Sequence, residues 1–360
     1  MSTFKASVPY NNLPLLPPDP AKIETIRILK QETRAASAIA ELKGIANIIP
    51  NQAILINAIV LQEAKDSSEI ENIITTSDDL YKAVSSSISK VDSATKEVMF
   101  YREALYLGHR KIVERGLLSI NDFIDIQSLV VRNNAGIRTT SGTALVNDAT
   151  GLIVYTPPEG EQTIRGLLQN LTEYLNNDDA SLVKVAILHY QFEKIHPFYD
   201  GNGRTGRIVN VLYLILKGYL DIPILNLSSY IIKNKPRYYE LLSSITTTGQ
   251  WEEWIIYMLK GIEVTAKVTI QKIKQIRSLL DETNILVKDR ASKIYSKELV
   301  ELLFVHPYCK IEFLTRQLKV ERKAASRYLY QLEELGILEL RKSGKENFFI
   351  NKELMRILSE

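Results

Sequence analysis

A twelve-residue segment, residues 196–207, carries the side chains best suited to chemistry. It combines an imidazole, a carboxylate, three glycines and two arginines: His196, Asp200, Gly201, Gly203, Gly206, Arg204 and Arg207. The histidine can take up a proton near neutral pH, and the glycines let the backbone approach a ligand closely. Two arginines three residues apart suit the oxygens of a polyphosphate, and the carboxylate suits a Mg²⁺ ion that bridges phosphates. We therefore predict a phosphate cradle with a base and a metal ligand beside it.

The flanking sequence supports this prediction. An apolar helix is expected over residues 181–195, and a second, apolar nearly all round, over Ile208–Leu216. Because the second helix begins at the loop, its free N–H groups and positive dipole end point at the same spot. A Walker loop needs Gly-Lys-Ser/Thr, which is absent, and the dinucleotide fingerprint follows a strand rather than a helix. The pattern favours transfer of a phosphorus-containing group from a nucleotide to a hydroxyl.

Composition sets the broad class of the protein. The 360 residues suffice for two or three domains, and 45 basic against 42 acidic side chains give a net charge of +3. That charge is too small to indicate a nucleic-acid or membrane partner. The single cysteine, Cys309, excludes an intrachain disulfide and predicts a reducing compartment. We see neither a signal peptide nor eighteen consecutive apolar residues, and expect a soluble, cytoplasmic protein.

Most of the chain shows helical periodicity. Residues 1–20 are Pro-rich and expected to be extended, and a helix is predicted over Ala21–Leu42 with Gly44 as its stop. A second pattern from Ile54 runs into the acidic segment 66–72, where Ser67 and Glu71 share one helix face. Taken alone, a solvated acidic turn explains this segment. Further helices are expected over 120–131, 163–178, Trp251–Leu259 and Ile262–Val287.

Residues 143–156 interrupt the helical pattern. Thr143–Val146 and Leu152–Thr156 predict two short strands around the turn 147–151, closed by two prolines. The exposed edge of such a hairpin can bind an extended peptide through main-chain hydrogen bonds. An ordinary surface hairpin explains the residues equally well.

The last seventy residues predict a winged helix. Helices are expected over Leu299–Phe304, Ile311–Leu318 and Ala324–Leu335, followed by a hairpin over residues 337–350. Six basic residues could meet DNA phosphates: Arg322, Lys323, Arg327, Arg341, Lys342 and Lys345. Five glutamates nearly cancel their charge: Glu321, Glu333, Glu334, Glu339 and Glu346. A DNA-binding regulator therefore stays an alternative.

A family resemblance adds to these expectations. Residues 196–207 match the Fic-domain signature HPFx(D/E)GNGRxxR at every defining position, and 67–72 resemble the family's inhibitory motif, (S/T)xxxE(G/N). Its place before the core resembles class II members, and the hairpin 143–156 resembles the target-binding flap. The resemblance implies a mainly α fold, a Fic-type helical bundle with a β-hairpin flap. Its implied parts are a helical region over 1–95, the core over 96–260, a connecting helix over 261–290 and a winged helix-turn-helix domain over 291–360.

The resemblance implies a protein adenylyltransferase that moves AMP from ATP to Ser, Thr or Tyr hydroxyls of a target protein and of itself. His196 would be the general base, Phe198 the apolar anchor of the loop, and Asp200 the ligand of Mg²⁺. The remaining residues implied for ATP binding are Gly201, Asn202, Gly203, Arg204, Thr205, Gly206, Arg207, Tyr238, Tyr239, Leu152, Ile153, Val154 and Tyr155. The target segment would pair with the flap.

The inhibitory motif implies a switch. Glu71, with Ser67, would form an ion pair with Arg207 and take the place of the γ-phosphate. Some relatives use this glutamate to remove AMP from the modified target, so the reverse reaction stays open. A homodimer also stays open.

Overall fold

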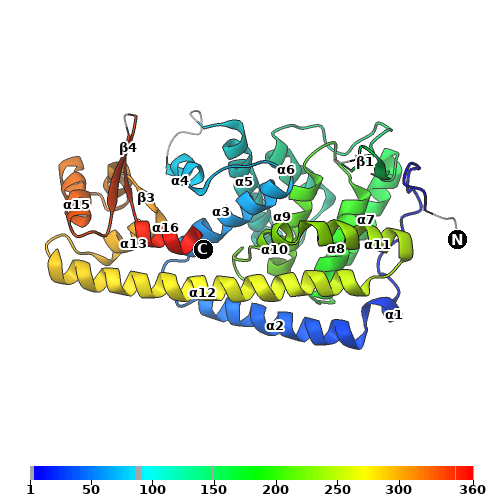
Figure 1. Ribbon diagram of the computed structural model, residues 1–360, viewed down its shortest axis with the longest axis horizontal. Coiled ribbons are helices and arrows are strands. Elements are labelled where there is room, and N and C mark those ends of the chain that lie inside the picture. The colour runs from blue at the N-terminus through cyan, green and yellow to red at the C-terminus, as the bar shows by residue number, and fades with distance from the viewer. Residues whose placement is uncertain (1–3, 86–90, 148–149, 345, 360) are drawn as a thin grey trace.

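The structure is a computed structural model that describes residues 4–85, 91–147, 150–344 and 346–359. It is mainly helical with two small sheets, and the predicted fold class is confirmed (Figure 1). Residues 148–149 of the predicted turn 147–151, and Lys345 of the predicted C-terminal hairpin, lie outside the described residues. Among the described residues, no helix combines the length and the apolarity needed to cross a membrane.

The bounds of the elements are as follows. The helices of the N-terminal region and the core are α1 (Pro20–Ile23), α2 (Ile26–Ala46), α3 (Ala53–Ile70), α4 (Ser77–Ser85), α5 (Ser93–Arg115), α6 (Ile120–Val131), α7 (Glu161–Asn176), α8 (Val183–Ile195), α9 (Asn202–Leu216), α10 (Ser228–Lys233), α11 (Lys235–Thr248) and α12 (Glu252–Arg290). The C-terminal helices are α13 (Lys297–Val305), α14 (Ile311–Gln317), α15 (Arg322–Glu334) and α16 (Lys352–Ser359). The strands are β1 (Leu145–Val146), β2 (Ile153–Tyr155), β3 (Tyr308–Cys309), β4 (Glu339–Ser343) and β5 (Glu346–Ile350).

The N-terminal helices differ from prediction in two places. The predicted helix over 21–42 is split, because Thr25 caps a new start by accepting a hydrogen bond from the Ile28 amide at 3.3 Å. Helix α2 then continues through Gly44, the predicted stop, to Ala46. A glycine within a helix costs only about 1 kcal/mol relative to alanine. The apolar face that α2 packs along α12 outweighs that cost (Figure 1).

Helix α12 joins two predicted helices into one of 39 residues, so the predicted boundary at 260/261 lies inside it. Gly261, at this boundary, is a packing position rather than a stop. A Cβ there would lie 2.9 Å from Cδ1 of Tyr230, so the glycine lets α10 approach closely. Trp254, one turn into α12, is fully buried and donates its indole N–H to the carbonyl of Ala186 at 2.8 Å. This contact fixes α8, the helix that leads into residues 196–207.

The C-terminal region has the predicted three helices and hairpin. It adds strand β3, which gives a sheet of order β3-β5-β4, and helix α16, neither of which we predicted. This domain packs on the helices around the inhibitory motif. The ring of Tyr308 stacks on Tyr81 of α4, its hydroxyl bonds Asp78, and its carbonyl accepts from Ser85 at 2.8 Å. Gln62 of α3 donates to the carbonyl of Leu358.

Candidate active site

The segment 196–207 closes on itself between α8 and α9. The Asn202 side chain accepts from the Phe198 amide at 2.9 Å and donates to the Phe198 carbonyl at 2.8 Å. Asn202 therefore clamps the loop through its side chain, and the phosphate contact implied for it stays a prediction. Phe198 is fully buried, as expected for the anchor. At the start of the loop His196 has a φ of +47°, a left-handed conformation that is uncommon for a residue with a Cβ.

The three glycines have separate roles. Gly201 has a φ of +76°, and a Cβ there would lie 2.7 Å from Val131 at the end of α6. The other two lie in regular turns of α9. At Gly203 a Cβ would meet Glu71 Oε1 at 2.2 Å and Arg207 Nη1 at 3.0 Å, so the missing side chain makes room for the contact between Glu71 and Arg207. Gly206 faces α8, where a Cβ would lie 3.1 Å from Phe192, and serves helix packing.

Arg207 is bound by the inhibitory motif. Its side chain is 3% exposed; Nε donates to Ser67 Oγ at 2.7 Å, and Nη2 donates to the Ser67 carbonyl at 2.9 Å and to Glu71 Oε1 at 2.7 Å. Ser67 is fully buried, whereas the Glu71 side chain is 37% exposed. Burial favours a higher pKa for Glu71, but the charge and hydrogen bond of Arg207 outweigh it and hold the pKa below its usual range. The predicted pair is therefore present, in the ionised form at neutral pH.

The backbone conformation at the end of α3 explains why an asparagine, Asn72, follows Glu71. Asn72 has a φ of +62°, and the Ile73 amide turns back to the Ser68 carbonyl at 3.0 Å. This left-handed ending is the one that glycine and asparagine adopt at helix C-termini. The chain can thus turn away directly after Glu71, which leaves its carboxylate beside Arg207.

The His196 imidazole is poised to accept a proton. Burial first, and then the positive charge of Arg138, lower its pKa to about 4, so it is neutral at neutral pH. Glu193, one turn earlier on α8, has its Oε1 buried without a hydrogen-bond partner among the described residues. Burial raises the pKa of Glu193 to about 7, with Arg207 opposing and Glu71 adding to the shift. We had not predicted Glu193, which lies outside the residues that define the signature.

Asp200 and Arg204 lie one helical turn apart, with Arg204 Nη2 at 3.8 Å from Asp200 Oδ1. The Asp200 side chain is 70% exposed, and its Oδ1 accepts from the Gly201 amide at 2.6 Å. Arg204 is buried and donates to Glu97 of α5 at 2.9 Å, a partner that sequence reasoning missed. Among the described residues no group of three or more His, Cys, Asp or Glu side chains could hold a metal ion. A single exposed carboxylate beside a phosphate site does fit Mg²⁺, which keeps several waters and binds through phosphates.

The flap residues divide between solvent and core. β1 and β2 pair antiparallel, with Leu145 opposite Tyr155. Leu152, Ile153 and Val154 are exposed, as a docking surface requires. Tyr155 is 2% exposed, and its hydroxyl donates to the Lys194 carbonyl at 2.8 Å, under the rings of Phe4 and Tyr10. Its side chain therefore anchors the flap, and the contact with ATP implied for it stays a prediction.

The other residues predicted to bind ATP have varied surroundings. Tyr238 is buried beside Trp254, and its hydroxyl bonds Nε2 of His189 at 2.8 Å. Tyr239, next to it, is 46% exposed. Thr205 is fully buried, and its hydroxyl has no partner among the described residues. The structure thus brings together His196, the start of α9 and the end of α3, while Tyr238 lies in the aromatic cluster beside them.

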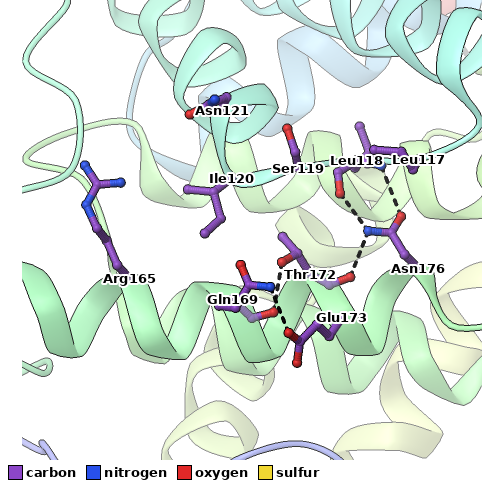
Figure 2. A pocket seen from close by; sticks show the side chains of 10 residues that line it. All are labelled: Leu117, Leu118, Ser119, Ile120, Asn121, Arg165, Gln169, Thr172, Glu173 and Asn176. Carbon is purple, nitrogen blue, oxygen red and sulfur yellow. Dashed lines mark hydrogen bonds between the residues drawn. The ribbon is translucent and has the colours of Figure 1, made fainter.

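A separate cleft of about 500 Å³ lies between the start of α6 and α7 (Figure 2). Asn176 at its end exchanges hydrogen bonds with the backbone of Leu118 at 2.7 and 3.1 Å. Gln169 and Glu173 pair with each other along α7 at 2.8 Å. Its lining contains none of the predicted site residues.

Three sequence profiles match this chain. They are "Fic/DOC family N-terminal" over residues 29–110, "Fic/DOC family" over 117–214 and "Protein adenylyltransferase SoFic-like, C-terminal domain" over 279–354. A Fido domain-containing protein of Dictyostelium discoideum is 40% identical over 93 residues, which are 24% of this chain and 65% of that protein. The protein adenylyltransferase fic-1 of Caenorhabditis elegans is 25% identical over 170 residues, 45% of this chain and 30% of that protein. The chain thus spans less than two thirds of the length of these curated relatives.

Two solved structures share the fold. A Fic family protein from Desulfovibrio desulfuricans has a TM-score of 0.55 and 18% sequence identity to this chain. The match covers 91% of this chain and 96% of that protein's chain. Fic-1 from C. elegans has a TM-score of 0.53 and 21% sequence identity, and the match covers 69% of this chain and 74% of the Fic-1 chain. The three profiles together cover the N-terminal, central and C-terminal parts, and the full signature lies in the structural context described above. The chain belongs to the Fic/DOC family.

Proposed function

We propose that this protein transfers AMP from ATP to Ser, Thr or Tyr hydroxyls of a target protein and of itself, and that Glu71 inhibits the transfer. The observation that carries the proposal is the contact between Glu71 and Arg207. It is a carboxylate bound to a buried guanidinium in the first turns of α9, where a helix start binds phosphate groups. Relatives named protein adenylyltransferases support the same reaction.

The chemistry follows from the positions of the side chains. His196, neutral at neutral pH, accepts the proton of the target hydroxyl, and the hydroxyl oxygen attacks the α-phosphorus. The bond from the α-phosphorus to the pyrophosphate oxygen breaks, and pyrophosphate leaves. Arg207 and the free amides of the first turn of α9 bind the phosphates. Asp200 would hold Mg²⁺, which, when bound, neutralises charge on the phosphate oxygens.

The flap supplies a docking place for the target. Leu152, Ile153 and Val154 are 67%, 42% and 45% exposed. They line a two-stranded hairpin, which leaves strand edges for an extended segment. Because the flap is anchored through Tyr155 to the carbonyl of Lys194, two residues before His196, a bound segment would lie at a fixed distance from the base.

Labelling with two forms of ATP tests the reaction. Glu71→Gly protein is incubated with ATP that carries the label in either the α- or the γ-phosphate, beside the same variant with His196→Ala. We expect the α-label alone to become attached to protein, with a mass gain of one AMP, and no attachment with His196→Ala. Transfer of the γ-label, or equal labelling with His196→Ala, contradicts the proposal. Adding wild-type protein to a pre-labelled target then tests the alternative, removal of AMP.

A further inference from the structure

A buried arginine, Arg138, joins the catalytic loop to the base of the flap. Its side chain is fully buried, and Nε donates to the His196 carbonyl at 2.7 Å. Nη2 donates to the Ile195 carbonyl at 3.2 Å and also to the Pro158 carbonyl, just past β2. Its backbone amide donates to the Pro197 carbonyl at 2.9 Å. One residue thus holds three consecutive peptide groups of the loop.

The described hydrogen-bond partners of Arg138 are backbone carbonyls rather than carboxylates. Among the described residues no carboxylate lies within ion-pair distance of Arg138, although a buried cation is unfavourable without compensation. The compensation comes from carbonyls, which the planar fork of a guanidinium can reach in several directions and a lysine ammonium cannot. Those carbonyls belong to the end of α8 and to His196, whose left-handed backbone has to be held by its surroundings.

We propose that Arg138 is a positioning residue for the transfer: it fixes the backbone of His196 relative to the flap, so that the imidazole meets a hydroxyl presented there. The catalytic consequence rests on the proposed function. The bridge between Ile137 and Phe198 continues the same attachment, so the segment before the flap forms one wall of the loop.

The charge of Arg138 acts on the same imidazole. Burial and Arg138 lower the pKa of His196, Glu71 and the Glu193 carbonyl raise it, and Lys194 lowers it further. Arg138 in turn faces Glu159, Tyr155 and Tyr199. A residue that only filled space would leave the pKa of His196 unchanged when replaced, and this difference separates positioning from structural support.

Nuclear magnetic resonance of the protein without ATP tests whether the positive charge of Arg138 lowers the pKa of His196. The chain has four histidines, so ¹³C-labelled imidazoles give few signals, and His196→Ala assigns the one of interest. Arg138→Met removes both the planar guanidinium and its charge, whereas Arg138→Lys removes the guanidinium and keeps the charge. We expect the pKa of His196 to rise above about 4 in Arg138→Met, with burial still holding it below its ordinary value, and to stay low in Arg138→Lys. An unchanged pKa in a folded Arg138→Met protein overturns the role of the charge.

ATP labelling in the Glu71→Gly background tests whether the guanidinium geometry of Arg138 is needed to position His196. Because small misplacements of a reacting group cost about tenfold or more in rate, we expect Arg138→Lys to lower kcat at least that much with little change in KM for ATP. Arg132→Met, an exposed arginine six residues earlier, is the control and should label normally. Normal kcat in Arg138→Lys overturns the proposal even if Arg138→Met does not fold. Absence of labelling in Glu71→Gly itself would refute the proposed function instead, while the resonance test still stands.

Discussion

Replacing Glu71 by glycine should increase the kcat/KM of the proposed activity for ATP, by a factor that can be worked out from the contacts of Glu71. The substitution removes one charge-assisted hydrogen bond of 2.7 Å to Arg207 and leaves both contacts from Ser67 in place. Hydrogen bonds to charged groups contribute about 1.5–3 kcal/mol. Since the Glu71 side chain is 37% exposed, solvent screening places its contribution at the lower end, about 1.5 kcal/mol. About 1.4 kcal/mol corresponds to a factor of ten, so we expect roughly tenfold higher kcat/KM for ATP.

The assay compares three proteins at one ATP concentration series. Wild type, Glu71→Gln and Glu71→Gly are labelled with α-labelled ATP, and initial rates give kcat/KM. Glutamine has nearly the size of glutamate and still accepts a hydrogen bond, but it carries no charge, so its value should fall between the other two. Glycine at this position introduces no backbone strain, because Glu71 has an ordinary φ of −90°.

The result that refutes this reasoning is equal kcat/KM in all three proteins, because then the pair with Arg207 does not compete with ATP. A gain in Glu71→Gly that matches Glu71→Gln would instead show that charge alone inhibits. Unfolding temperatures measured in parallel exclude a trivial effect of stability on the rate.

Four further outcomes follow from the same contacts. Ser67→Ala should change labelling by less than about threefold, because the Ser67 hydroxyl contacts Arg207 whether or not Glu71 is displaced, and Glu71 keeps its place beside the guanidinium. Gly203→Ala should lower the melting temperature, and Glu71→Gly should restore most of the loss, because the new Cβ meets Glu71 at 2.2 Å. Labelling by Glu71→Gly should be flat from pH 5 to 8 and fall below about pH 4, because His196, with its pKa lowered to about 4, is a neutral base above that value and protonated below it. Asp78→Asn should lower the free energy of unfolding by about 1 kcal/mol, because Asp78 pairs with Lys82 and Arg341 and bonds Tyr308.

Sequence reasoning located the centre of the site because its parts are contiguous. His196, Asp200 and Arg207 lie within twelve residues, and an apolar helix after them can only be buried. The predicted helix over 120–131 is confirmed at both ends, and Ser119 and Asp122 form a capping box at its N-terminal end. Such local signals depend on neighbours in the chain, which a sequence displays directly.

The residues that sequence reasoning missed depend on contacts between distant segments. Glu97, the partner of Arg204, lies 107 residues before it in the chain. Arg138 lies 58 residues before His196 and belongs to no motif, and its contact depends on an isolated bridge with no periodic pattern. Strand β3 has two residues, too few for any alternation to be visible.

The exposures around Arg207 indicate what has to move when ATP binds. Ser67 is fully buried in the body of α3, which is held by the C-terminal domain through Gln62 and by α10 through Glu63 and Ser228. Moving Ser67 away would require the whole helix to shift. Glu71 caps the end of α3, is partly exposed, and precedes a turn, so rotation of its side chain alone removes it from Arg207. On the proposed function, the γ-phosphate would replace Glu71 while Ser67 continues to hold the guanidinium, and the switch would be a side-chain movement on a fixed helix.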